Sequence, residues 1–128
     1  MTQCVGKKTT KFTTTSTAAV TVNVTIPTDT DGISYANSAF KITYKILYNL
    51  GGSLVGYLES VGMFSISAGS SYAVGYDVLV QVGPAGTLSG QALSCPSNGV
   101  FQLSFSPPSA SSTTFFVVQE IQAYDTGV

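Results

Sequence analysis

Apolar and polar residues alternate with a period of two along almost the whole of this 128-residue chain. Successive side chains of a β-strand point to opposite faces of a sheet, so this alternation predicts strands with one buried and one solvated face. No window of the sequence combines the 3.6-residue apolar spacing and the caps of a helix. The expected strands are 18–26, 40–50, 53–61, 63–68, 72–82, 87–93, 100–105 and 113–124.

Turn-forming residues separate these runs. Pro27 and the segment 28–32 end the first of them, and Gly51-Gly52 mark a hairpin because glycine adopts a positive φ at little cost. Short strands at even spacing predict a single all-β domain, an antiparallel two-sheet β-sandwich of which a jelly roll is one form. We expect the sandwich domain to comprise residues 18–128. Residues 1–17 are expected to be a flexible or strand-donating N-terminal arm, or an edge strand.

The hairpin through Gly51-Gly52 has two possible registers. A three-residue loop places Leu50 opposite Leu54 and Lys45 opposite Glu59, which pairs opposite charges and aligns the apolar faces. A two-residue loop would place Lys45 opposite Leu58. The first register is therefore the prediction.

Two further strands show which residues should face the core. In 100–105, Phe101, Leu103 and Phe105 are expected to face inward. The run 72–82 is expected to present one apolar side to the core, with Ala73, Gly75, Asp77, Leu79 and Gln81 opposite. That apolar side comprises Tyr72, Val74, Tyr76, Val78, Val80 and Val82.

The residue types that are missing exclude whole classes of function. The chain has no histidine and no arginine, its five lysines face six acids, and only 9% of its residues are charged. Histidine triads and histidine metal sites are therefore excluded, and a basic nucleic-acid footprint is lacking. The longest apolar run, 115–118, is far too short for a membrane helix, and the N-terminus has no apolar signal region. We expect no cofactor, no metal, no membrane and no nucleic-acid partner.

The acidic residues do not predict a catalytic site. Glu59, Asp77 and Glu120 lie on expected strands, and no sequence feature brings two of them together as glycoside hydrolysis requires. Asp29 and Asp31 suit a turn, because the further oxygen ligands of a calcium loop are absent. The many serines have no base to activate them. The chain is expected not to be an enzyme.

Cys4 and Cys95 lie far apart in the sequence. Two thiols are too few for a structural zinc site. Free, partly buried thiols are the favoured interpretation, and a disulfide between the N-terminal arm and the loop before Pro96 is the alternative. A reactive thiol is the least favoured, since no neighbouring cation lowers either pKa.

Large apolar side chains also fall on the face expected to be wet. Leu47, Val55 and Tyr57 do so in the hairpin, and Phe116, Val118 and Tyr124 do so in the last strand. Strands that are apolar on both faces need a second cover, so a second sheet, an arm or another subunit is expected there. A sugar-binding platform is the competing hypothesis, although tryptophan is absent.

Three stretches carry a resemblance to a known class of protein. TTSTAAVTVNVTIPTDTDG, SAFKITYKILYNLGG-SLVGYLESVGMFSISAG and TTFFVVQEIQAYDTG together resemble small β-sandwich structural proteins of tailed-phage virions, both capsid decoration (cement) proteins and tail or fibre proteins. The last strand of that class often carries a tryptophan, where this chain has Phe115 and Phe116. The resemblance implies a non-enzymatic subunit on the virion surface, a homo-oligomer with a trimer favoured, bound to a major capsid or tail protein.

The expected interface follows from this resemblance and from the apolar wet face. Lys7, Lys8 and Lys11, with Phe12, lie on an arm that could reach an acidic capsid surface, although a frayed, solvated terminus is the favoured interpretation of the lysines. A pilin-like filament subunit, in which 9–17 completes a neighbour's sheet, is one other hypothesis. A carbohydrate- or receptor-binding fibre tip, with a glycan as ligand, is another.

Overall fold

The computed structural model describes residues 2–25, 37–67, 70–84 and 86–125, with side chains described for all of these except 2–5, 37, 71–74 and 125. Strands make up most of the described chain, and it contains no helix. The strands are β1 (Thr2–Thr14), β2 (Val20–Thr25), β3 (Asn37–Leu50), β4 (Leu54–Ser67), β5 (Ser70–Val82), β6 (Ser89–Ser97), β7 (Val100–Ser106) and β8 (Thr113–Asp125).

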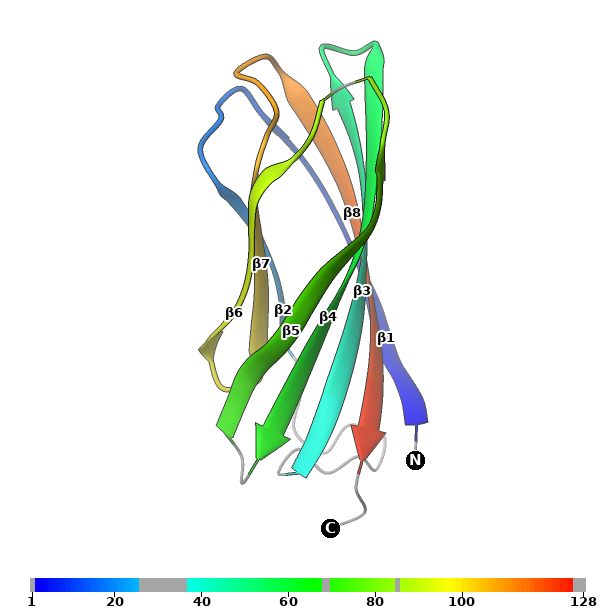
Figure 1. Ribbon diagram of the computed structural model, residues 1–128, viewed down its shortest axis with the longest axis vertical. Helices are drawn as coiled ribbons and strands as arrows, with labels where there is room; N and C mark the ends of the chain where they lie inside the picture. Colours follow the sequence, from blue (N-terminus) through cyan, green and yellow to red (C-terminus); the bar gives the residue numbers. More distant parts are fainter. Residues whose placement is uncertain (1, 26–36, 68–69, 85, 126–128) are drawn as a thin grey trace.

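The strands form two antiparallel sheets that face each other (Figure 1). One sheet has the order β1-β8-β3-β4-β5 and the other the order β2-β7-β6. The two ends of the chain are nested, since β1 pairs with β8 in one sheet and β2 pairs with β7 in the other, as outer strands do in a jelly roll. Between them β3, β4 and β5 form a meander, and β6 contacts β5 across the sheets. The predicted two-sheet β-sandwich is confirmed.

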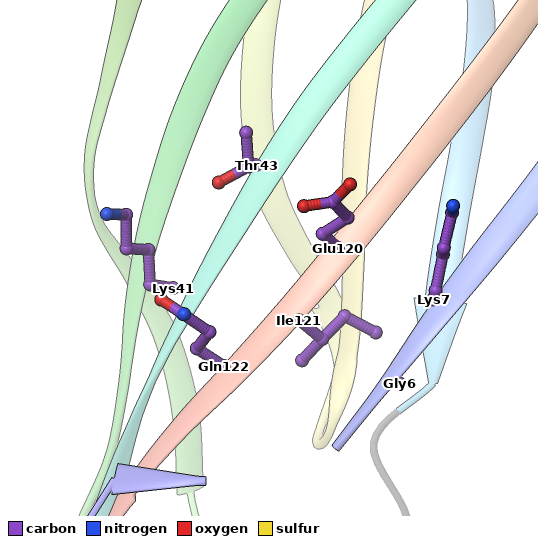
Figure 2. A pocket seen from close by; sticks show the side chains of 7 residues that line it. All are labelled: Gly6, Lys7, Lys41, Thr43, Glu120, Ile121 and Gln122. Atoms are coloured by element: carbon purple, nitrogen blue, oxygen red, sulfur yellow. The ribbon is translucent and has the colours of Figure 1, made fainter. Parts of the chain in front are cut away.

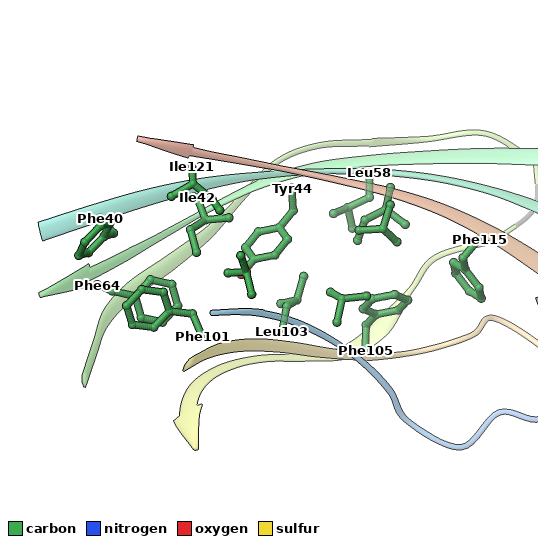
Figure 3. Close-up of a cluster of buried hydrophobic side chains, with 14 of the residues drawn as sticks. Phe40, Ile42, Tyr44, Leu58, Phe64, Phe101, Leu103, Phe105, Phe115 and Ile121 are labelled. Atoms are coloured by element: carbon green, nitrogen blue, oxygen red, sulfur yellow. The ribbon is translucent and has the colours of Figure 1, made fainter. Parts of the chain in front are cut away.

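The core lies between the sheets. It is built from every second residue of the strands, whose side chains point inward. The alternate β3 residues from Phe40 to Tyr48 are buried, and β7 contributes Phe101, Leu103 and Phe105, as predicted for 100–105. The rings of Phe64 and Phe101 stack across the sandwich with their centroids 3.9 Å apart (Figure 3). Burial of these apolar side chains is the dominant stabilising term for such a fold.

The hairpin between β3 and β4 has the predicted register. Leu50 pairs with Leu54, and Lys45 pairs with Glu59. Gly51 and Gly52 have φ values of 64° and 86°, a region that only glycine adopts without strain. The loop thus sets which residues of both strands share a face.

Two strand predictions are wrong. Segments 53–61 and 63–68 form the single strand β4, because Gly62 remains in the ladder between Ile42 and Tyr76. In β5 the register shifts between Glu59 and Ser60, so that Leu79 is an extra residue.

This bulge reverses the faces of the end of β5. Val80 and Val82 lie opposite Glu59 and Tyr57 on the solvent side. Gln81 turns inward, where its Oε1 accepts a hydrogen bond of 2.9 Å from the amide of Leu88. Tyr76 packs partly buried against the core, as predicted, whereas the side chain of Tyr72 lies outside the described part.

The N-terminal segment is an edge strand in this structure. Positions from Thr2 to Thr14 pair with β8, with one register shift between Cys4 and Gly6. Residues 9–14 therefore complete the sheet of their own chain. Phe12 faces inward and stacks on Phe115 with a centroid separation of 5.2 Å, so it packs, partly buried, against the core. Asp29 and Asp31 lie outside the described residues.

Candidate functional site: the outer face of the five-stranded sheet

The face of the five-stranded sheet that points away from the second sheet, here called the outer face, carries most of the exposed apolar side chains. The antiparallel pairings arrange its residues in rows across the strands. One row, from β1 to β5, is Lys11, Phe116, Leu47, Tyr57 and Val82. The next is Thr9, Val118, Lys45, Glu59 and Val80.

An apolar strip runs across these rows at the end of the face nearest the Gly51-Gly52 hairpin. We define the apolar strip as Leu47, Val55, Tyr57, Val80, Val82, Phe116 and Val118. Leu47 is 44% exposed, Val82 59% and Phe116 42%, which is high for large apolar side chains in neighbouring positions. A contiguous exposed patch of this kind typically marks an interaction site.

The structure brings together five of the residues that the sequence predicted for an interface: Leu47, Val55, Tyr57, Phe116 and Val118. Tyr124 is on the same strand as Phe116 but four rows away, and its hydroxyl donates to Gln122 at 3.4 Å. Val80 and Val82 were missed, because the β5 bulge that turns them outward leaves no signal in the alternation.

The centre of the outer face holds a charged cluster beside the apolar strip. Lys45 Nζ lies 3.1 Å from Glu120 Oε1, and this hydrogen bond raises the pKa of Lys45. Tyr57 donates its hydroxyl to Glu59 Oε2 at 3.2 Å; burial and then the Glu59 charge raise the pKa of Tyr57. Glu59 and Glu120 thus flank Lys45. The predicted hairpin register indicated the Glu59 neighbour, whereas nothing in the sequence indicated Glu120.

The three arm lysines do not point the same way. Lys7 and Lys11 lie on the outer face at the β1 margin, in the rows of Glu120 and Phe116. Lys8 faces the opposite side, where its Nζ donates to the carbonyl oxygen of Asn23 on β2 at 2.8 Å. The basic arm of the sequence hypothesis is therefore divided between two surfaces.

A pocket of about 270 Å³ opens on the outer face beside the β1 register shift (Figure 2). Glu120 lies in its middle, between Lys7 on β1 and Lys41 on β3 (Figure 2). The lining residues are Gly6, Lys7, Lys41, Thr43, Glu120, Ile121 and Gln122. Ammonium, hydroxyl and amide groups of this kind can hydrogen-bond a hydroxylated or anionic ligand.

The remaining candidates for a chemical site are metal-binding clusters and the two cysteines. No group of three or more His, Cys, Asp or Glu side chains there is placed to hold a metal, and no helix of that part could cross a membrane. Cys95 is a free, half-buried thiol packed on the core, and burial raises its pKa. The Cys4–Cys95 disulfide, the less favoured interpretation, is not formed, because β1 and β6 lie at opposite edges of the sandwich. The side chain of Cys4 lies outside the described part.

Comparison with known proteins yields one loose likeness. No protein-family model and no curated protein matches the chain. Among solved structures, it is similar to the crystal structure of the Acinetobacter phage vB_ApiP_P1 tailspike protein, with a TM-score of 0.43 and 16% identity over 89% of this chain. The chain spans 22% of the length of that tailspike chain. A likeness of this size carries no conclusion about function.

Proposed function

We propose that this chain is a non-enzymatic structural subunit of a phage virion, attached to its neighbours through the outer face of the five-stranded sheet. The observation that carries the proposal is the apolar strip. Large side chains such as Phe116, Leu47 and Val82 remain exposed there, although most apolar side chains on the opposite face of the same sheet are buried. Apolar and aromatic residues with few charges are typical of the centre of a protein interface.

The composition supports the same proposal. With only 9% charged residues, the chain can pack against neighbours while few ions lose their hydration shell. The resemblance of its strand order and hairpin to small virion β-sandwich proteins supplies the class of assembly. The proposed place is the virion surface, as a capsid decoration or tail-associated subunit in a homo-oligomer.

Phage particles purified from the organism that encodes this chain provide the test. Mass spectrometry and immunogold labelling should detect the chain on intact particles. The double variant L47S/F116S should reduce its incorporation by about tenfold or more, because two anchors of the apolar strip are lost. The matched control is T21A, at an exposed β2 position on the other sheet. Absence of the wild-type chain from intact particles, or full incorporation of L47S/F116S, would refute the proposal.

The pocket beside β1 favours carbohydrate binding as a second candidate function. Lys7 and Lys41 outnumber the single carboxylate of Glu120 in its lining, and Thr43 and Gln122 add neutral hydrogen-bonding groups. This set fits a sugar that carries a carboxylate. Binding on a glycan array should be lost in K41M and kept in K8M, since Lys8 lies on the other side of β1. An array without signal for the wild-type chain would exclude this candidate.

A further inference from the structure

The outer face has opposite charges at its two margins. One row of paired residues runs Lys7, Glu120, Thr43, Val61 and Asp77, from the first strand of the sheet to the last. Lys7 and Asp77 are both exposed. A cation on β1 and an anion on β5 therefore stand at the same level along the strands, on either side of the centre.

Two copies of such a face can stack in two simple ways with two-fold symmetry. One axis lies in the plane between the two copies and runs perpendicular to the strands. It places β1 of one copy over β1 of the other, so that the β1 lysines of the two copies face each other. An axis parallel to β3 places β1 of one copy over β5 of the other and keeps each row at its own level. The margin charges are complementary only in the second arrangement, in which each contact occurs twice.

We propose that a second copy of this chain packs on the outer face about a two-fold axis parallel to β3. Lys7 of each copy then lies opposite Asp77 of the other. This inference rests on the proposed function in that both use the outer face, and it names the occupant of that face.

The apolar strip fits the same rotation. Leu47 lies on the central strand of its row, so it meets its own counterpart near the axis, while Phe116 of one copy faces Tyr57 of the other. Stacked sheets lie about 10 Å apart, a gap that large apolar side chains from both faces fill. Lys41 and Lys45, both on the central strand, also come near their own counterparts. Glu120 of the same copy lies 3.1 Å from Lys45 and lines the same pocket as Lys41.

Charge reversal combined with analytical ultracentrifugation tests this arrangement. The wild-type chain should sediment as a dimer. The single variants K7E and D77K should each raise the dimer Kd by about tenfold, since each creates two like-charge contacts. The double variant K7E/D77K should restore the Kd to within about threefold of the wild type, because the pair is rebuilt with exchanged signs.

Two controls separate this pairing from general effects. K8E changes the net charge as K7E does, but Lys8 faces β2, so its dimer Kd should stay close to that of the wild type. V82S should weaken the dimer without rescue by either charge variant. Each variant must keep the circular dichroism spectrum of the wild type.

Three results would overturn the inference: a wild-type monomer at high concentration, a trimer, or a double variant no tighter than the singles. A monomer would leave attachment to other virion proteins open, which the particle experiment decides separately. Loss of the chain from particles together with an intact, charge-coupled dimer would instead refute only the virion function.

Discussion

Replacing Gly56 by alanine tests how tightly the wall of the core is packed at the hairpin. Gly56 pairs with Tyr48 across β3 and β4, and the ring of Tyr48 lies over the glycine. A Cβ atom at Gly56 would stand 2.3 Å from Cζ and 2.6 Å from the hydroxyl oxygen of Tyr48. Tyr48 must move to accommodate it.

Tyr48 is held in place by its neighbours. Its side chain is fully buried, its hydroxyl donates to the carbonyl oxygen of Gly86 at 2.6 Å, and its ring stacks on Phe115 at 5.8 Å. Overpacking costs about 1–3 kcal/mol. The lost hydrogen bond adds about 1 kcal/mol, and the lost ring contact about 0.5–1.5 kcal/mol. Alanine regains about 0.5–1 kcal/mol as the better strand residue.

Gly56→Ala should therefore lower the free energy of unfolding by about 1.5–5 kcal/mol, measured by urea denaturation with a two-state fit. The matched control is Gly75→Ala, because a Cβ there meets nothing within 4 Å. That variant should be neutral or slightly more stable. In Tyr48→Leu/Gly56→Ala the loss should be smaller than the sum of the single losses, since the clashing ring atoms are gone. A Gly56→Ala loss below about 1 kcal/mol would show that Tyr48 moves freely and would refute this reasoning.

Three further outcomes follow from buried polar groups. The hydroxyl of Tyr44 is buried and has no hydrogen-bond partner among the described residues, so Tyr44→Phe should raise the unfolding free energy by about 1–3 kcal/mol in urea denaturation; a loss would reveal a partner. Burial, and then Tyr76 and Cys95, raise the pKa of Tyr44 above 10, so the unfolded chain loses this proton first. The contribution of Tyr44 to stability should be intact below pH 10 and fall above it by about 1.4 kcal/mol per pH unit. The free energy of unfolding should therefore fall less steeply with pH in Tyr44→Phe than in the wild type; an equal slope in both chains would contradict this origin. Iodoacetamide should label Cys95 slowly in the folded chain and quickly in urea, because the thiol is half-buried and its pKa is raised. Mass spectrometry of the peptide that contains Cys95 measures both rates, and equal rates would contradict this placement.

Local sequence determined most of the fold of this chain. Alternation in β3 and β7 assigned their buried faces correctly, because the side-chain period of a strand is two wherever the ladder is regular. The Gly51-Gly52 loop and the Lys45–Glu59 pair set the hairpin register. The position of Leu47, Val55 and Tyr57 on the outer face followed from that register.

Only the tertiary structure decided what lies beside these residues. The bulge at Leu79 arises from pairing between β4 and β5, and it turns Val80 and Val82 outward against their sequence pattern. Phe12 joins the core because β1 pairs with β8, a partner more than a hundred residues away in the chain. The row that joins Lys7 to Asp77 crosses five strands. Alternation indicates which face of the sheet a residue takes within its own strand, whereas strand order depends on long-range pairing. The sequence alone therefore determined the face on which most side chains lie. The tertiary structure determined which of these side chains become neighbours on one surface.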